Sequence, residues 1–255
     1  IQRLKNYMNF KKIDPKFIKK TNPRIGLIAL ASDFVIERDF TTVIKEKNID
    51  FFVNRIKSYD PLTRENLIKM SEEITSVTNE ILPNEKIDCV VYGCTSGTIA
   101  SGFSSIERKI KDAKPLSKVT TPSSAAISAL KKLNIKKISI FTPYPKKLND
   151  EVVSFFKNEK FDVTANAYLD IDSDSDIWKV DPDFLYEVLI NMDHAAADAV
   201  FISCTALPVL QIIKKLETNL NKFVLSSNQV LIWDTLEKIG QNNSITGFGK
   251  LFTSN

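Results

Sequence analysis

Two cysteines of this 255-residue chain lie where side chains could do chemistry. Cys94 lies in a glycine-dense stretch, residues 93–102, which holds three of the chain's seven glycines. Cys204 follows another apolar run, and both cysteines precede a helical pattern. In a parallel α/β unit, ligands bind where a strand ends and the next helix begins. A helix N-terminus favours thiolate and lowers a thiol pKa from about 8.5. The pattern therefore predicts two reactive thiols, able to attack a small ligand or to move protons on its two faces.

The elements that position these cysteines follow from short apolar runs that alternate with longer amphipathic segments. The runs are continuous rather than alternating, as in strands that are covered on both faces. Expected strands are Ile25–Ala31, Ile87–Tyr92, Ile138–Thr142, Ala199–Ser203 and Phe223–Leu225. Expected helices are Pro61–Leu82, Ser123–Leu133, Lys147–Asn158, Pro182–Ala197 and Leu207–Leu216. This alternation predicts an α/β fold with parallel sheets.

A faint internal repeat relates the two cysteines. Asp88–Thr95 aligns with Asp198–Thr205 at an offset of 110 residues, with the pattern Asp, apolar run, small residue, Cys, Thr. Ile25–Ala31 aligns loosely with Ile138–Pro143 at an offset near 112. Two matches at nearly one offset indicate two copies of one α/β unit.

Several other kinds of site find little support. The single histidine, His194, lies in an expected helix and is interpreted as a surface residue, which argues against a Cys–His hydrolase. Cys89 lies inside an apolar run and is expected to be a buried hydrophobe. Its spacing from Cys94 is unlike that of zinc ligands. Asp170–Asp176 looks like a loop without the glycine and glutamate of a calcium loop, and no phosphate-binding glycine motif occurs.

The charge distribution bears on partners and location. The net charge is +4, yet residues 1–24 carry eight basic and one acidic side chain, so the remainder is slightly acidic. Without aromatic–basic interleaving, this arm is expected to be solvated rather than to bind nucleic acid. No apolar run reaches eighteen residues, so no membrane span is expected. Free cysteines and the lack of a secretion signal favour the cytoplasm.

At this point the motifs resemble a known family. Gly93–Gly97 and Phe201–Thr205 resemble the two cysteine motifs of the aspartate/glutamate racemase superfamily, within it the branch of maleate cis–trans isomerases, arylmalonate decarboxylases and ectoine-utilisation proteins. Further matching stretches are Arg24–Ile28 with Glu37–Phe40, Phe141–Tyr144, Val180–Pro182, and Ser227–Gln229 with Trp233. The resemblance covers about residues 24–240.

The resemblance implies two Rossmann-like lobes with parallel sheets, related by pseudo-twofold symmetry, with the site in the cleft between them and no cofactor. The corresponding boundaries are a basic arm at 1–23, lobes at 24–122 and 123–225, and a C-terminal segment at 226–255 that returns to the first lobe. Cys94 would be the nucleophile, Cys204 the acid/base partner, and Tyr144 a hydrogen-bond donor to the substrate carboxylate. A homodimer is also implied. In racemases of the superfamily the same two positions remove and return an α-proton.

Asp33 departs from the maleate isomerases, which place an asparagine there. An ionised aspartate would repel a carboxylate, so Asp33 argues against maleate unless it is protonated. It would suit a substrate that carries an amine or a hydroxyl, or act as a base beside Cys94. It could also be only a helix or turn cap. Further candidate substrate-binding residues are Thr95, Ser96, Thr205, Asn228 and Arg55.

Three functions remain open on the sequence. The first is a cofactor-independent isomerase or racemase that acts on a small carboxylic acid with two cysteines. The second is a decarboxylase of the arylmalonate type, which needs one cysteine as proton donor. The third is a binding protein that kept the fold without catalysis. The second cysteine favours the first function.

Overall fold

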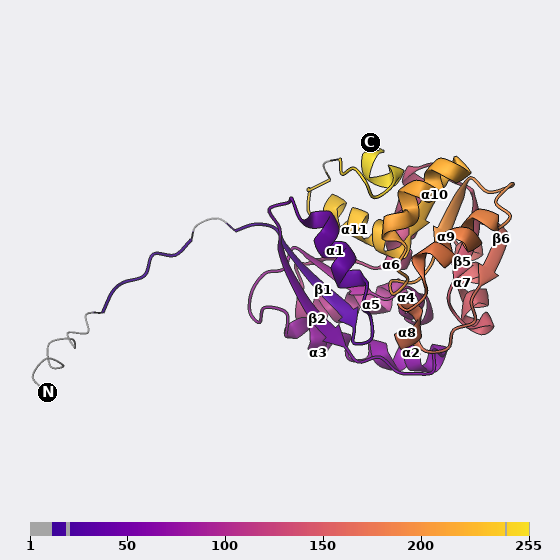
Figure 1. Cartoon of the computed structure of the whole chain (residues 1–255). Helices are drawn as coiled ribbons and strands as arrows, with labels where there is room; N and C mark the ends of the chain where they lie inside the picture. The colour runs from indigo at the N-terminus through magenta and orange to yellow at the C-terminus, as the bar shows by residue number, and fades with distance from the viewer. Residues whose placement is uncertain (1–11, 19–20, 243, 255) are drawn as a thin grey trace, which may run out of the picture.

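Two four-stranded parallel sheets form the core of the computed structural model, which describes residues 12–18, 21–242 and 244–254. The first sheet has the order β2-β1-β3-β4, and the second has β6-β5-β7-β8. The strands are β1 (Arg24–Leu30), β2 (Asp50–Ile56), β3 (Cys89–Gly93), β4 (Lys118–Thr120), β5 (Lys137–Thr142), β6 (Asp162–Tyr168), β7 (Ala199–Ile202) and β8 (Phe223–Ser226). The same strand order in both sheets confirms the predicted two-lobed α/β fold (Figure 1).

Helices connect the strands and fill the space between the two sheets. They are α1 (Ile36–Ile44), α2 (Arg64–Ser71), α3 (Ile74–Asn79), α4 (Thr95–Ser101), α5 (Phe103–Ala113), α6 (Pro122–Lys132), α7 (Lys146–Asn158), α8 (Asp174–Ile177), α9 (Pro182–Asn191), α10 (Ile213–Leu220) and α11 (Ser227–Lys238). Short 3₁₀ helices are Leu210–Ile212 and Lys250–Thr253. Helices α4, α6 and α11 lie in the middle of the molecule (Figure 1).

The structure corrects several expected helices. The segment expected at Pro61–Leu82 is two helices, α2 and α3, with a break near Glu72. The helix expected at Pro182–Ala197 ends at Asn191. The segment 207–216 begins as a turn, and α10 starts only at Ile213. An apolar spacing therefore located the helices but not the breaks between them.

The internal repeat has a structural counterpart at the start of each lobe. The Asp88 carboxylate accepts a hydrogen bond of 2.9 Å from the backbone N–H of Arg24, at the first residue of β1. The Asp198 carboxylate accepts one of 2.8 Å from Lys137, at the first residue of β5. Each aspartate therefore joins the beginnings of two neighbouring strands, which explains why the repeated motif begins with this residue.

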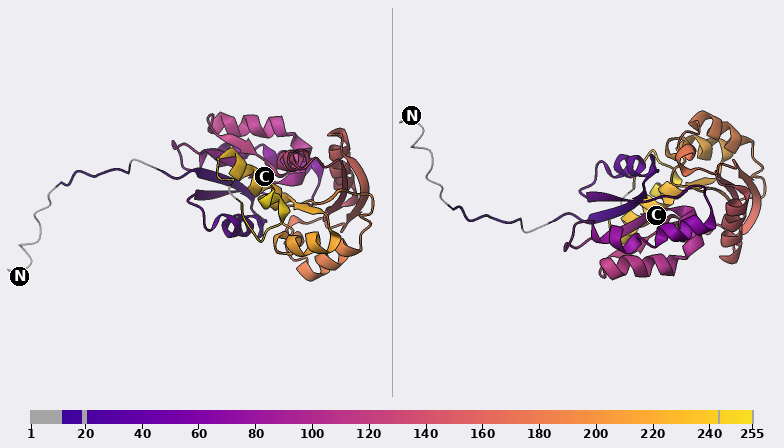
Figure 2. Two further views of the ribbon diagram at one scale, coloured as in Figure 1. Left: turned by 90° about the horizontal axis from the view of Figure 1, so that it is seen from above. Right: turned by 90° about the horizontal axis from the view of Figure 1, so that it is seen from below.

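The C-terminal helix connects the two halves of the fold. Helix α11 follows β8 of the second sheet, yet it packs against α6, α1 and strands β3 and β4. Seen from above and below, the gold C-terminal residues lie between the indigo strands of the first sheet and the second sheet (Figure 2). This placement is in keeping with a C-terminal segment that returns to the first lobe, although the exact lobe boundaries stay a prediction.

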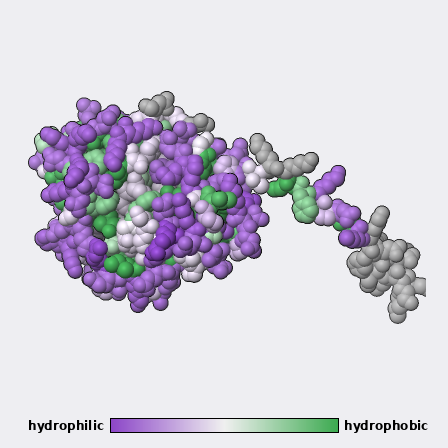
Figure 3. Space-filling model, turned by 180° about the vertical axis from the view of Figure 1, so that it is seen from behind, coloured by the Kyte–Doolittle hydropathy of each residue, from purple (hydrophilic) through white to green (hydrophobic). Residues whose placement is uncertain are grey.

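One face of the molecule can be judged for apolar patches. The face opposite to that of Figure 1 is mostly hydrophilic, with separate hydrophobic side chains (Figure 3). Residues 12–18 of the basic arm extend away from the body and are exposed (Figures 1 and 2). No helix in the described part of the chain is long and apolar enough to cross a membrane.

Candidate active site

Cys94 caps the amino end of α4, immediately after β3. Its backbone is extended, and its Sγ accepts a hydrogen bond of 3.2 Å from the backbone N–H of Gly97. The Ser96 hydroxyl lies 3.8 Å from the same sulfur. A Cβ on Gly97 would come within 2.8 Å of both Cys94 Sγ and Tyr92 Oη. Gly97 is thus required for space beside the sulfur, which gives a physical reason for one of the clustered glycines.

Cys204 is positioned differently. Its φ angle of +100° lies in the left-handed region that residues with a side chain rarely adopt. The expectation of a helix directly after it is wrong, because Thr205, Ala206 and Leu207 form a turn. The two cysteines therefore share a strand-end position but not a helix N-terminus.

Hydrogen bonds hold the two cysteine loops against each other. The Ser227 hydroxyl accepts a hydrogen bond of 2.9 Å from the Thr95 hydroxyl and one of 3.0 Å from the Cys204 backbone N–H. The Thr205 hydroxyl donates to the carbonyl oxygen of Gly93 at 3.2 Å. These bonds bring the carboxyl ends of β3 and β7 together in the joint between the lobes.

Tyr144 lies beside both thiols. It is 2% exposed, and burial raises its pKa well above its ordinary value, with further increases from the negative charges that Cys204 and Cys94 would carry. The structure therefore brings Cys94, Cys204 and Tyr144 into one buried centre.

The thiols themselves are held in their neutral form, so the expectation of lowered pKa values is wrong. Each cysteine is 4% exposed. Burial raises the pKa of Cys94 to about 12 and that of Cys204 well above its ordinary value, and the nearby carboxyl of Asp174 adds to both shifts. The cost of removing water from a buried thiolate exceeds the stabilisation that the amino end of the two-turn helix α4 gives, because that end supplies only a partial charge.

Asp33 is both a cap and a member of the buried centre. One carboxylate oxygen, Oδ1, accepts hydrogen bonds from the backbone N–H groups of Val35 at 2.7 Å and Ile36 at 2.9 Å. The other oxygen, Oδ2, is buried without a hydrogen-bond partner among the described residues. Burial raises the pKa of Asp33, against the effect of these bonds and of Arg55. The neutral carboxyl is therefore favoured relative to an ordinary aspartate.

Arg55 is engaged in holding the Asp33 turn. Its guanidinium donates to the carbonyl oxygens of Leu30 at 3.0 Å and Asp33 at 2.9 Å, and forms an ion pair of 2.7 Å with Glu37. These contacts position the turn that carries Asp33. Carboxylate binding by Arg55 stays a prediction.

Asn228 connects the buried centre to α1. Its amide nitrogen donates to Asp39 Oδ2 and to the Thr205 carbonyl oxygen, both at 2.8 Å. Because the nitrogen must face the carbonyl acceptor, the orientation of the amide is fixed. Its oxygen is left buried and without a partner in the described structure.

Replacing Asp39 with asparagine should stabilise the fold in a pH-dependent way. Burial raises the pKa of Asp39 from 3.8 to about 7. A carboxyl that keeps its proton longer when folded costs stability as the pH rises from about 3.8 to about 7. We expect Asp39→Asn to raise the melting temperature by about 5 °C at pH 8 and hardly at all at pH 4.

Thermal unfolding across this pH range, monitored by calorimetry, measures the effect. Asp112→Asn, at an exposed position of α5, is the matched control and should change the melting temperature equally little throughout. If Asp39→Asn raises the melting temperature by the same amount at pH 4 and pH 8, the raised pKa of Asp39 is contradicted.

Three residues of the centre were missed on the sequence. Asp174 was read as part of a polar loop, in which the family resemblance places a ligand contact within residues 169–174 without identifying the residue. Tyr92 was read as an ordinary strand residue, and Ser227 only as part of a motif. Asp174 is 6% exposed, Tyr92 is fully buried with its hydroxyl unpartnered near Cys94, and Ser227 joins the two loops. Nothing in the sequence separates Asp174 from its neighbouring aspartates; only its tertiary contacts do.

His194 is also corrected. It is 5% exposed rather than a surface residue, and it lies after the end of α9. Its ring nitrogens pair with the Ser139 hydroxyl at 2.7 Å and the Leu189 carbonyl oxygen at 2.6 Å. These partners make it a structural residue of the second lobe. In the described residues, no group of three or more His, Cys, Asp or Glu side chains could hold a metal ion.

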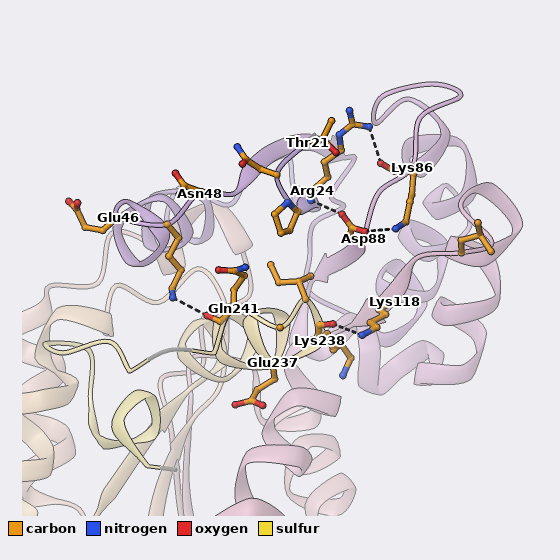
Figure 4. A pocket seen from close by; sticks show the side chains of 16 residues that line it. Thr21, Arg24, Glu46, Asn48, Lys86, Asp88, Lys118, Glu237, Lys238 and Gln241 are labelled. Carbon is orange, nitrogen blue, oxygen red and sulfur yellow. Dashed lines mark hydrogen bonds and ion pairs between the residues drawn. The ribbon is translucent and has the colours of Figure 1, made fainter. Parts of the chain in front are cut away.

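A large hollow of about 1190 Å³ lies elsewhere, at the amino ends of the first sheet's strands (Figure 4). Its basic side chains are already engaged: Lys86 with Asp88 at 2.7 Å, and Lys47 with the Gln241 carbonyl oxygen at 2.9 Å. Ligands of parallel α/β folds bind at the opposite, carboxyl ends of the strands. The buried centre at those ends is therefore the better candidate site.

Fold and site together define a two-lobed α/β protein with a cysteine from each lobe. The sequence profile of the arylmalonate decarboxylase family matches residues 95–252, more than half of the chain. The chain belongs to this family of the aspartate/glutamate racemase superfamily.

Individual relatives agree with this assignment. A maleate isomerase of Geobacillus stearothermophilus is 26% identical, covering 90% of this chain and 97% of its own. The maleate isomerase Iso from Pseudomonas putida S16, solved as a cysteine-to-alanine variant with maleate, has a TM-score of 0.85 at 21% identity, covering 92% and 98%. A Nocardia farcinica maleate cis–trans isomerase with a covalent succinylcysteine intermediate has a TM-score of 0.85 at 18% identity, covering 91% and 99%. At these identities the solved structures support the fold.

Proposed function

We propose that this protein is a cofactor-independent isomerase or racemase of a small carboxylic acid, with Cys94 and Cys204 as its two reacting side chains. The observation that carries the proposal is that the Ser227 hydroxyl joins the two cysteine loops, by accepting from Thr95, the residue after Cys94, and from the backbone N–H of Cys204. Two thiols that face one ligand from opposite lobes suit a reaction in which bonds form or break on its two faces.

Two forms of the reaction fit this arrangement. In racemisation, the thiolate of one cysteine takes the α-proton and the thiol of the other returns a proton to the opposite face. In cis–trans isomerisation, the Cys94 thiolate adds to the alkene while the Cys204 thiol gives its proton to the neighbouring carbon, and the C–C bond, now single, rotates. Elimination then returns that proton to Cys204 and releases the trans alkene and the Cys94 thiolate. The maleate isomerases and the succinylcysteine adduct among the relatives support the second form.

Both forms need one thiol to lose its proton. The raised pKa values of the thiols make this unfavourable in the closed, dry centre. Asp33, whose carboxyl has an unpartnered oxygen in the same centre, is proposed as the acceptor. Tyr144 and Ser96 are proposed to hold the substrate carboxylate through their hydroxyls, whereas Thr95 and Thr205 already donate their hydroxyl protons to Ser227 and to the Gly93 carbonyl oxygen and are proposed to hold the two loops in place.

Proton NMR in D₂O tests the proposal. The purified protein is incubated with small acids, including maleate and amino acids of both hands, and the spectra are followed for exchange at the α-carbon, for fumarate and for inversion. Exchange with inversion indicates racemisation, and conversion of maleate indicates isomerisation. Carbon dioxide release from an aryl malonate without either would favour the decarboxylase instead, and binding without any turnover would favour a binding protein.

A homodimer and a cytoplasmic location stay predictions for this chain.

A further inference from the structure

A segment of the second lobe reaches across to cover the buried centre. The backbone N–H of Leu62 donates to the Asp172 carbonyl oxygen at 2.7 Å, and the backbone N–H of Asp174 donates to the Asp60 carboxylate at 3.1 Å. The rings of Phe34 and Trp178 lie 4.7 Å apart between their centroids. Residues 172–178 are thereby fastened to the first lobe at several points.

This segment brings Asp174 into the centre. The Ser32 hydroxyl, on the turn that leads to Asp33, donates to Asp174 Oδ2 at 2.5 Å. The other oxygen of Asp174 has no hydrogen bond from the described residues. Ser32 is the residue before Asp33, so this bond places Asp174 close to the Asp33 turn, and the charges of both carboxyl groups raise the pKa of Cys94 and of Cys204.

Some of the buried polar atoms around this centre are hydrogen-bond acceptors that receive no hydrogen bond. Asp33 Oδ2 and Asn228 Oδ1 are both buried and unpartnered in the described structure. The Asn228 amide nitrogen is already used twice, so this side chain offers the centre only an acceptor. A buried acceptor that lacks a donor destabilises the unliganded centre, and a ligand with N–H or O–H groups would remove this cost.

Arg55 is the cation that lowers the pKa of Asp33, whereas no cation among the described residues shifts the pKa of Asp174. The charged side chains that act most on the two thiols are both aspartates, and the nearby Arg55 is paired with Glu37 and backbone carbonyls. A dicarboxylate would place two negative charges beside two acids, whereas an ammonium group would form charge-assisted hydrogen bonds to them.

We propose that Asp174 is a specificity residue that, together with Asp33, receives a protonated amine of the substrate, so that the preferred substrate is a small amino acid rather than a plain dicarboxylic acid. This inference rests on the proposed function for its location and deepens it by naming the substrate class. The hydroxyls of Tyr144 and Ser96 remain available for the carboxylate of such a substrate.

Matched pairs of ligands test the inference. The intact protein is titrated calorimetrically with aspartate, glutamate and alanine, in both hands, and with their amine-free counterparts succinate, glutarate and propionate; maleate is added as a rigid dicarboxylate. We expect at least one amino acid to bind tighter than its counterpart and than maleate. Asp174→Asn should weaken that binding about 10- to 100-fold and leave the counterpart unchanged or tighter.

Two further variants sharpen the result. Asp172→Asn, in the same segment with an exposed side chain, should leave every affinity unchanged. Asp33→Asn keeps a cap for α1 but offers a donor, so it should shift preference toward the amine-free acids. The inference is overturned if the amine-free acids or maleate bind the unmodified protein at least as tightly as every amino acid, or if Asp174→Asn weakens both classes equally.

The same ligands, followed by NMR in D₂O, separate this inference from the proposed function. Amino-acid binding that depends on Asp174, without exchange or isomerisation of any compound, would keep amine recognition and overturn the catalytic proposal. Turnover of maleate without recognition of amino acids would keep the catalytic proposal and overturn amine recognition.

Discussion

Replacing either Cys94 or Cys204 with alanine is expected to lower turnover by at least about 10³-fold. Each thiol is proposed to form or break a bond on its own face of the ligand, and no histidine lies in the centre to take over. Both cysteines are buried but have small side chains, so replacing either with alanine removes one sulfur atom and should leave the fold intact. Initial rates for the substrate found in the D₂O screen, compared at equal folded concentration, measure the loss.

Cys89→Ala is the matched control for these variants. Cys89 is also a buried cysteine of the first lobe, on β3, with a pKa raised to about 12 by burial. It should keep nearly full activity. A Cys204→Ala protein that is as active as its parent would contradict the two-thiol mechanism and leave a mechanism with one reacting cysteine.

Gly97→Ala is expected to reduce kcat/KM about 10²-fold. The added methyl group would meet Cys94 Sγ and Tyr92 Oη at 2.8 Å and Met70 Cε at 3.2 Å, so the sulfur must move. Displacing a reacting atom by about 1 Å costs roughly this much in rate. Steady-state kinetics together with the melting temperature would show a loss of activity larger than the loss of stability explains.

Gly26→Ala, on β1 of the same sheet, controls for crowding alone. Its added methyl group would meet only side-chain atoms of Ile81 and Ile87, at 3.2 to 3.4 Å, and none of the centre. It should lower stability without a specific effect on kcat. If Gly97→Ala matches the parent in kcat/KM, Cys94 Sγ is not the reacting atom or its position is uncritical.

The central strands could be predicted from the sequence because they are buried on both faces. Strand β3 and strand β7 are fully buried and appear as continuous apolar runs. Strands β2, β4 and β6 were missed: β2 and β6 carry a half-buried, mixed pattern, and β4 has only three residues. Strand β8 also lies at the edge of its sheet but is mostly buried, and its apolar run was predicted, so burial and length rather than edge position decide which strands the sequence reveals.

Part of the candidate site could be predicted from the sequence, because some of its residues lie just after the carboxyl ends of strands. Cys94 and Cys204 could be named because each follows an apolar run, and Asp33 and Tyr144 because of the resemblance to the family's motifs. The protonation state of the thiols could not be predicted, because it depends on burial by segments distant in the chain. Asp174 reaches Ser32 across 142 residues, and such a contact leaves no local trace in the sequence.

The hydroxyl of Ser227 makes the two cysteine loops mechanically dependent on each other. One oxygen atom accepts from Thr95, beside the first cysteine, and from the backbone of the second. Separating the two loops therefore breaks at least one of these hydrogen bonds, so the distance between the two thiols depends on this one side chain from α11.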